Sequence, residues 1–316
     1  MSVSATAAVP LIMGPTGAGK TDLALRLAQK YPIEIVSVDS AMVYRGMDIG
    51  TGKPSREVLE RVPHHLVDIL DPSQAYSAGR FVRDAQQLIA AARARGKLPV
   101  LVGGTMLYFR ALRRGLAEMP TADPQVRREI DTEAIQQGWP ALHARLALLD
   151  PAAAARIQPN DGQRIQRALE VHRLTGKTMS ELHAQTRPAD PAMKFAAFAW
   201  APSDRERLYD AIERRFTAMM SAGLLDEVQR LQQRGDLHAD LPAIRSVGYR
   251  QLWEHLHGQA SLASSVRSAI YATRHLARRQ LIWLRAEHDV RWCDALDSGA
   301  ADQIERAIAM VCELDR

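Results

Sequence analysis

The sequence contains little cysteine and no long apolar run. Its two cysteines, Cys293 and Cys312, are too few for a disulfide framework or a four-cysteine zinc site, which favours a reducing environment. The longest apolar runs, residues 98–104 and 195–201, fall far short of the ~20 residues needed to cross a bilayer. Residues 1–9 lack the basic start of a signal peptide. We therefore expect a cytoplasmic protein with no membrane partner.

Neither sign of charge dominates the chain. Lysine and arginine total 41 against 36 aspartates and glutamates, which gives a net charge of +5. This balance permits a polyanionic partner without requiring one, because solvated basic faces are common. The 316 residues, 47% hydrophobic and 24% charged, are typical of a folded chain. Their number exceeds the roughly 150 residues of one domain and predicts two units.

Short apolar runs alternate with amphipathic stretches in the first third of the chain. The runs predict buried parallel strands, and the stretches predict helices at residues 21–30 and 79–95. This alternation is typical of a doubly wound α/β sheet. Later in the chain we expect two further strands and two long helices, at about residues 204–234 and 261–287. The predicted strands are residues 9–13, 33–38, 65–70, 98–102, 195–200 and 290–293.

The middle of the chain has a different pattern. From residue 113 to about residue 187 the periodicity is helical only, with breaks expected at Pro140, Pro151 and Pro159. The simplest interpretation is an α/β core interrupted by helices. We predict a core made of residues 1–112 and 195–316 and a helical insertion domain at residues 113–194.

A phosphate-binding motif joins the first predicted strand to the first predicted helix. It matches G-x-x-x-x-G-K-[ST], the P-loop pattern, in the setting that this pattern requires. Its glycines let backbone N–H groups converge on phosphate oxygens, Lys20 adds a positive charge, and the Thr21 hydroxyl can bind Mg²⁺. The motif predicts polyphosphate binding but leaves open ATP hydrolysis, phosphoryl transfer and diphosphate displacement. It comprises Gly14, Pro15, Thr16, Gly17, Ala18, Gly19, Lys20 and Thr21.

Asp39 directly follows the second predicted strand. The carboxyl ends of the strands line the ligand crevice of an open α/β sheet, so we expect Asp39 to face the phosphate loop. An aspartate that only caps a turn is the alternative. The segments Thr51-Gly52-Lys53-Pro54 and Gly103-Gly104-Thr105 leave a similar choice between a ligand-binding loop and a plain turn.

Taken together, these motifs and three others closely resemble the tRNA dimethylallyltransferases, also called tRNA isopentenyltransferases. The resemblance runs in order from about residue 9 to residue 285, and residues 39–51 carry far more of it than the phosphate loop. Many members carry glutamine where Met42 stands, and the zinc-finger extension of eukaryotic members is missing, so we expect the bacterial form. The motifs are residues 14–21, residues 39–51, Pro63-His64-His65, Gly103-Gly104-Thr105, Pro159-Asn160-Asp161 with Arg164 and Arg167, and Arg245-Ser246-Val247-Gly248-Tyr249-Arg250.

The resemblance implies a reaction on tRNA. A dimethylallyl group passes from dimethylallyl diphosphate to N6 of the adenosine 3′-adjacent to the anticodon, and diphosphate is released. Because the N6 lone pair is delocalised into the ring, attack is easier when a carboxylate removes a proton, and Asp39 is the candidate general base. The loop N–H groups, Lys20, and Mg²⁺ at Thr21 are expected to stabilise the leaving diphosphate.

Two positions complete the expected catalytic set. The resemblance assigns diphosphate binding to Arg215, although the adjacent Arg214, or a merely solvated arginine, is the alternative. The hydroxyl of Thr105 is expected to hydrogen-bond the substrate near the reacting atoms.

Arginines are placed to bind RNA in three regions. Arg164 and Arg167 lie about one helical turn apart, so both can face one RNA strand. Arg245 and Arg250 flank Tyr249, whose ring could stack on a base. We expect the insertion domain to bind the anticodon stem-loop, with a lid over a small substrate as the alternative. The residues expected to contact tRNA are Asp39, Ser40, Ala41, Met42, Thr105, Gln163, Arg164, Ile165, Gln166, Arg167, Arg245, Ser246, Val247, Gly248, Tyr249, Arg250 and, on the late helix, Arg278.

Other functions stay open at this point. A P-loop small-molecule kinase would use the same phosphate loop and an aspartate after the second strand. A prenyltransferase that modifies free adenine nucleotides would share the chemistry, and a non-catalytic RNA-binding module would share the arginines. For the oligomeric state we expect a monomer.

Overall fold

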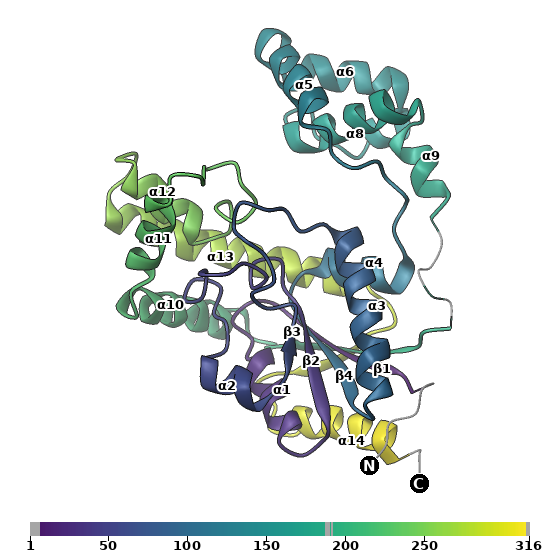
Figure 1. The fold of residues 1–316 in the computed structure, drawn as a ribbon, viewed down its shortest axis with the longest axis vertical. Helices are drawn as coiled ribbons and strands as arrows, with labels where there is room; N and C mark the ends of the chain where they lie inside the picture. Colours follow the sequence, from purple (N-terminus) through teal and green to yellow (C-terminus); the bar gives the residue numbers. More distant parts are fainter. Residues whose placement is uncertain (1–6, 187–189, 191, 314–316) are drawn as a thin grey trace. The chain divides into compact units, whose positions relative to one another are not determined.

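The computed structural model describes residues 7–186, 190 and 192–313 (Figure 1). The chain forms two compact units: Met1–Ala111 with Pro191–Arg316, and Leu112–Asp190. We refer to them as unit 1 and unit 2. The boundaries expected from the sequence, at residues 113 and 194, differ from these by a few residues.

Unit 1 is built on a six-stranded sheet with the order β3-β2-β4-β1-β5-β6, in which all pairs of neighbours are parallel. The central strand β1 is buried at every position, as a strand covered on both faces requires. The predicted α/β class is confirmed. The strands are β1 (Val9–Met13), β2 (Ile33–Val38), β3 (His64–His65), β4 (Leu98–Gly103), β5 (Phe195–Ala201) and β6 (Arg291–Asp294).

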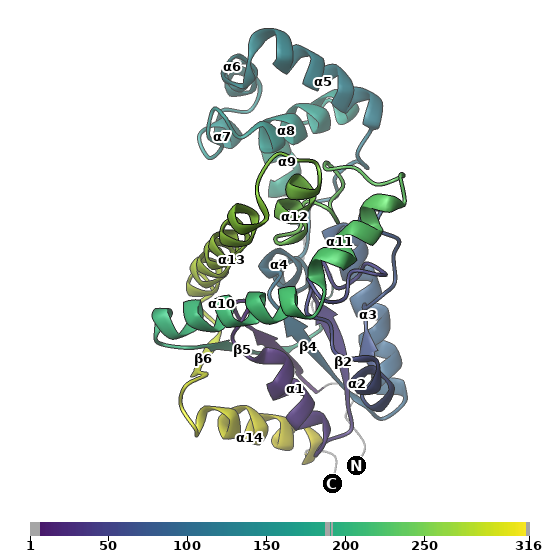
Figure 2. The same ribbon diagram turned by 90° about the vertical axis from the view of Figure 1, so that its left-hand side faces the viewer.

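Helices cover both faces of this sheet (Figure 2). Helices α1 (Lys20–Ala28) and α14 (Ala300–Glu313) share one apolar core with the strands, in which Leu27 and Ile304 are fully buried. Helix α3 (Ala78–Ala94) contacts β2 and β4. The chain crosses the sheet in one direction from β1 to β2 and in the other from β3 to β4, so right-handed connections place α1 and α3 on opposite faces.

The remaining helices of unit 1 mostly follow β5. One long helix was expected over residues 204–234, but Gly223 adopts φ +94° and divides it into two, because few residues other than glycine tolerate that conformation. Within the described residues, no helix combines the length and the apolar composition that crossing a membrane takes. These helices are α2 (Arg56–Arg61), α4 (Met106–Arg114), which runs across the boundary into unit 2, α10 (Arg205–Ser221), α11 (Leu224–Gln233), α12 (Tyr249–Leu256) and α13 (Leu262–Arg285).

The strand expected at residues 65–70 is wrong beyond His65. Leu66 and Asp68 adopt positive φ values of 62° and 55°, which breaks the extended pairing. The segment instead bonds to the turn after β2, where the Leu70 N–H donates to the Val43 carbonyl at 2.9 Å. The backbone therefore leaves the sheet edge after a two-residue strand.

Unit 2 is helical and has a core of its own. Ile130, Leu142 and Ile165 are buried together at its centre. The helical stretch is interrupted beside Pro140 and Pro151, as expected, and each proline lies in the first turn of the helix that follows, where the missing N–H costs nothing. The helices are α5 (Pro124–Gln137), α6 (Trp139–Leu149), α7 (Pro151–Ala154), α8 (Gly162–Thr175) and α9 (Met179–Ala184).

Candidate active site

The phosphate loop between β1 and α1 is held against strand β5. Gly17 and Gly19 have φ values of +83° and +78°, which side chains rarely allow. A Cβ atom on Gly14 would lie 2.1 Å from the Trp200 carbonyl oxygen, so glycine is required there. The Trp200 indole N–H donates to the Ala18 carbonyl at 2.8 Å. The loop is thus fixed by the neighbouring strand.

Lys20 is partly buried at the base of this loop. Its ammonium donates to the Pro15 carbonyl at 2.7 Å. Burial lowers the pKa of Lys20 to about 7; the Asp39 carboxylate raises it and the Arg215 guanidinium lowers it further. A buried amine with this pKa gains or loses its charge near neutral pH, and an anion placed beside it favours the charged form.

Asp39 lines the same pocket as Lys20 and Thr21. Its Oδ1 also accepts the backbone N–H groups of Ala41, at 2.8 Å, and Met42, at 3.3 Å. The carboxylate therefore caps the turn after β2 and faces the phosphate loop as well. This side chain fits both interpretations that the sequence left open, since it caps the turn and also lines the pocket beside the phosphate loop.

Arg215 reaches the pocket from α10. Its Nη1 donates to the Thr16 hydroxyl at 3.4 Å and its Nη2 to the Thr51 carbonyl at 3.3 Å. Burial lowers the pKa of Arg215, while the nearby Asp39 opposes that effect. Its neighbour Arg214 is exposed and is not among the residues that line the pocket. Of the two arginines, the geometry therefore favours Arg215 as a group that binds diphosphate.

Thr105 lies beside Asp39 where β2 and β4 end. Its N–H donates to the Val38 carbonyl at 3.1 Å, and its hydroxyl accepts the Ser40 N–H at 3.1 Å. Neither Thr105 nor Ser40 is among the residues that line the pocket. Each directly follows a residue that does line the pocket: Ser40 follows Asp39, and Thr105 follows Gly104.

The pocket wall changes from charged to apolar along the strands. Ser37 and Ile35 lie on one face of β2 and Asp39 lies just beyond its end, so the lining becomes apolar toward the interior of the sheet. On α1, Ala24 follows Thr21 by one turn. A short apolar group attached to an anion fits such a wall. The lining residues are Thr16, Lys20, Thr21, Ala24, Ile35, Ser37, Asp39, Met42, Thr51, Gly52, Pro54, His64, Val67, Val102, Gly103, Gly104, Arg215 and Gln280.

Oxygen donors for Mg²⁺ are present in this pocket. The Thr21 hydroxyl and the Asp39 carboxylate both line it, and Mg²⁺ prefers oxygen ligands, usually supplied in part by substrate phosphates. Among the described residues no group of three His, Cys, Asp or Glu side chains could hold a metal ion. The donor set fits a magnesium ion that arrives with a diphosphate better than one held by protein groups alone.

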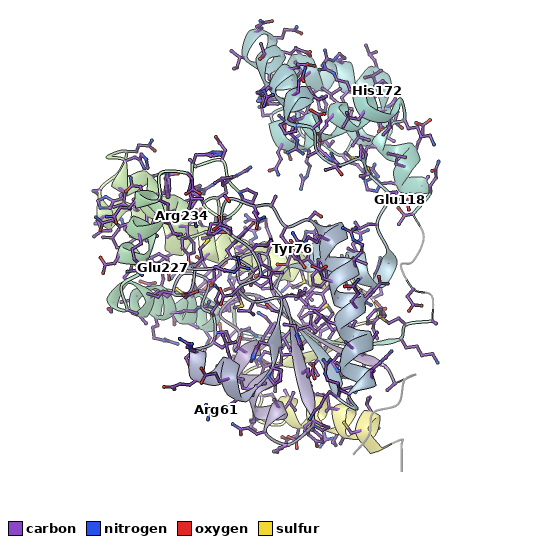
Figure 3. All side chains as sticks on the ribbon, in the orientation of Figure 1. Arg61, Tyr76, Glu118, His172, Glu227 and Arg234 are labelled. Atoms are coloured by element: carbon purple, nitrogen blue, oxygen red, sulfur yellow. The ribbon has the colours of Figure 1, made fainter. Side chains whose placement is uncertain are left out.

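Glu227, labelled in Figure 3, anchors residues 48–50, a role that no pattern in the sequence indicates. This buried carboxylate on α11 accepts the N–H groups of Asp48, Ile49 and Gly50 at 2.9, 2.8 and 3.1 Å. It also accepts the Tyr249 hydroxyl at 2.6 Å. The expectation that a base stacks on the Tyr249 ring is therefore wrong, because this ring is fully buried.

We predict that Glu227→Leu lowers the free energy of unfolding by about 2–4 kcal/mol, because it leaves three backbone N–H groups and the Tyr249 hydroxyl without their acceptor. Urea unfolding followed by circular dichroism measures the change. Tyr249→Phe removes only one of the four bonds and is expected to cost about 1 kcal/mol. An equal loss in both variants would contradict the anchoring role.

Unit 2 separates the expected RNA-binding residues into two groups. Gln163, Arg164 and Arg167 line one concave surface together with Arg156. Ile165 is instead fully buried in the core, so the expectation that it contacts tRNA is wrong.

The two predicted RNA-binding arginines of α8 differ in their bonds. Arg164 is exposed and pairs with Asp161. Arg167 is bonded to the buried Glu170 carboxylate at 2.6 Å and to the Pro120 carbonyl at 2.8 Å. Arg167 therefore has a structural role whether or not it contacts RNA.

The expected RNA-binding residues of unit 1 also divide by exposure. Arg245, Arg250 and Arg278 are exposed, and none of them lines the pocket. Ser246 and Val247 are half-buried. Gly248, the N-cap of α12 with φ +94°, is buried and has no side chain that could contact RNA.

Comparisons with known proteins identify this architecture. The model of the IPP transferase family matches residues 42–287, and that of isopentenyl transferases matches residues 7–69. The chain belongs to the IPP transferase family. Among curated members, the tRNA dimethylallyltransferase of Burkholderia multivorans is 55% identical over 98% of both chains. That of Ralstonia pickettii is 53% identical over 94% of this chain and 93% of the relative.

Two solved structures have a similar fold over nearly the whole length of this chain. The tRNA isopentenylpyrophosphate transferase of Bacillus halodurans is 36% identical, with a TM-score of 0.70 over 97% of both chains. A eukaryotic dimethylallyltransferase acting on tRNA is 26% identical, with a TM-score of 0.79 over 98% of this chain and 79% of the other. The predicted family and P-loop α/β fold are confirmed.

Proposed function

We propose that this protein is a tRNA dimethylallyltransferase that moves the dimethylallyl group of dimethylallyl diphosphate to N6 of the adenosine 3′-adjacent to the anticodon. The observation that carries the proposal is one pocket that joins Lys20 and Thr21 of the phosphate loop to Asp39 and an apolar wall. Relatives that are 52–55% identical over nearly their full length carry the name tRNA dimethylallyltransferase. Prenyl transfer to tRNA is the activity of this family.

The proposed reaction exchanges a C–O bond for a C–N bond. The N6 nitrogen attacks the allylic carbon of the donor, and the bond from that carbon to the diphosphate oxygen breaks. Asp39 accepts the proton that N6 loses, which keeps nucleophilic electron density on nitrogen. Negative charge grows on the diphosphate, where the loop N–H groups, Lys20 and Arg215 stabilise it. Magnesium held at Thr21 would neutralise further charge on the same oxygens.

The adenine must leave its stack to enter such a pocket. Anticodon-loop bases are already single-stranded, so extrusion costs a few kcal/mol or less. We infer that the concave surface of unit 2 with Arg156, Arg164 and Arg167 binds the stem-loop backbone through phosphates. The exposed Arg245, Arg250 and Arg278 of unit 1 are candidates for further phosphate contacts.

Mass spectrometry of an anticodon stem-loop after incubation with the protein, dimethylallyl diphosphate and Mg²⁺ tests the function. We expect one dimethylallyl group on the adenosine 3′ to the anticodon and an equal amount of free diphosphate. Transfer of the γ-phosphate from labelled ATP to a small molecule would instead indicate a kinase. Equal rates on AMP and on the stem-loop would contradict the choice of tRNA as acceptor.

Arg164→Ala is expected to weaken tRNA binding and to reduce the slope of log K against log salt concentration by about one, because each phosphate contact releases counterions. Filter binding at several salt concentrations measures both. Arg173→Ala is the matched control, since Arg173 lies nine positions along α8 and therefore on its opposite face. If the slope is unchanged in Arg164→Ala, Arg164 does not contact the phosphates of the tRNA.

Arg167 must be tested with stability measured in parallel. Glu170 is fully buried and bonds to two guanidinium groups, those of Arg127 and Arg167. Removing one partner leaves buried negative charge undercompensated, so Arg167→Ala lowers the stability of unit 2 as well. For this reason Arg164 alone, and not the pair, reports cleanly on RNA binding.

A further inference from the structure

Gln280 is a polar side chain in the buried row of α13. Its neighbours in that row, Ala277 and Leu284, are fully buried and apolar, and Gln280 itself is only 9% exposed. Burying a carboxamide is unfavourable unless both of its ends find hydrogen-bond partners. An apolar residue would continue the row without that cost, so the partners of Gln280 explain its presence.

Both ends of this carboxamide are bonded to backbone groups of the pocket wall. Oε1 accepts the Thr16 N–H at 2.8 Å, and Nε2 donates to the Gly104 carbonyl at 2.8 Å. A backbone N–H can only donate and a carbonyl can only accept, so the orientation of the amide is fixed by its partners. Gln280 is also one of the residues that line the pocket.

The two hydrogen-bond partners of Gln280 belong to different segments of the site, the phosphate loop and the end of β4. Thr16 belongs to the phosphate loop, and its hydroxyl accepts a bond from Arg215. Gly104 directly precedes Thr105, whose hydroxyl holds the Ser40 N–H beside Asp39. The side chain of Gln280 therefore connects the part that would hold the diphosphate to the part that would hold the adenine.

The glycine at position 104 makes this connection possible. A Cβ atom there would lie 2.4 Å from Nε2 of Gln280 and 3.2 Å from the Gly14 carbonyl oxygen. A side chain at this position would displace the Gln280 carboxamide from the Gly104 carbonyl. Because Gly104 has no side chain, the Gln280 carboxamide fits against it. This contact sets the distance between the phosphate loop and the end of β4.

We propose that Gln280 is a positioning residue that fixes the distance between the diphosphate cradle and the edge of the pocket that holds the adenine. This inference rests on the proposed function. Transfer requires the nitrogen and the allylic carbon to meet in line at about 3–3.5 Å, and a displacement of about 1 Å can cost roughly 10²-fold in rate. Each substrate binds to one part only, so Gln280 acts on the transfer step rather than on either affinity.

Gln280→Met tests this role, because methionine has nearly the same length and suits the buried row but makes neither hydrogen bond. We expect the single-turnover rate with both substrates saturating to fall by about 10–100-fold. The dissociation constants of dimethylallyl diphosphate and of the stem-loop, measured by titration calorimetry and filter binding, are expected to change less than about threefold. The urea midpoint of unfolding is expected to stay close to that of the unaltered protein.

Ser265→Ala is the matched control, since it makes a buried polar residue of the same helix apolar at a position that does not line the pocket. It is expected to leave the transfer rate unchanged. An unchanged rate in Gln280→Met would overturn the proposal, and so would a weaker affinity for the donor that accounts for the whole loss. If the unaltered protein transfers no dimethylallyl group, the proposed function fails, whatever Gln280 does.

Discussion

Asp39→Asn is expected to lower kcat by about 10²–10⁴-fold while the affinity for tRNA stays the same. Asparagine keeps an Oδ1 atom that can accept the N–H groups of Ala41 and Met42, so the turn after β2 is preserved. The substitution removes only the group that can accept a proton. Steady-state kinetics with mass-spectrometric detection and filter binding of the stem-loop measure the two quantities.

Two further variants make that result interpretable. Asp39→Ala loses the turn bonds as well as the carboxylate, so any stability loss in it beyond that of Asp39→Asn measures the cap. Asp302→Asn, on the exposed surface of α14, is the matched control and is expected to be fully active. If Asp39→Asn keeps most of its kcat, or loses tRNA affinity to the same extent, the carboxylate is not the general base.

Lys20→Met is expected to lower kcat/KM for dimethylallyl diphosphate by about 10²–10³-fold, the range typical of losing one group that stabilises developing negative charge. Lys30→Met is the matched control, because the Lys30 ammonium is exposed and pairs with Glu305 away from the pocket. An equal effect of the two substitutions would argue against a diphosphate site at the loop. The comparison uses initial rates at low donor concentration.

The lowered pKa of Lys20 gives this site a characteristic pH dependence. Without an anion its pKa is about 7, and a bound diphosphate raises it by favouring the charged ammonium. Donor binding therefore takes up a proton above about pH 7, and affinity falls as pH rises from there toward the pKa of the complex. Calorimetry in buffers of different ionisation enthalpy detects the uptake. Lys20→Arg is expected to abolish it, because a guanidinium stays charged.

The lowered pKa of Lys20 also makes folding depend on pH. Stability rises with pH, whereas the affinity for the donor falls. The native state holds Lys20 at a pKa below its ordinary value of 10.5, so between about pH 7 and that value the unfolded chain binds more protons. Stability from this group therefore rises with pH over that interval. Keeping Lys20 charged in the folded state lowers the free energy of unfolding. Lys20→Met is therefore expected to be more stable than the parent protein at neutral pH.

Much of the fold and part of the site could be predicted from local sequence. The P-loop pattern, the buried strands 9–13 and 33–38, and the position of Asp39 after the second strand all depend on residues close together in the chain. The periodicity of an apolar run reports directly on the element that buries it. The order of motifs then sufficed to identify the family.

Predictions from the sequence were wrong where a residue contacts an element far away in the chain. The strand expected at residues 65–70 ends early because Leu66 and Asp68 turn the backbone toward the segment after β2. Tyr249 was expected to face RNA because arginines surround it, yet its hydroxyl bonds to Glu227, which no nearby pattern indicates. In both places the sequence neighbours of a residue differ from its neighbours in space.

The sequence by itself determined the family, the parallel sheet, the phosphate loop and the carboxylate that follows the second strand. Only the tertiary structure decided that Arg215 rather than Arg214 lines the pocket, that Ile165 is a core residue, and that Gln280 joins both sides of the site. The physical reason is distance along the chain. The bond from Thr16 to Gln280 spans 264 positions, and such a contact exists only once the sheet and its helices have packed.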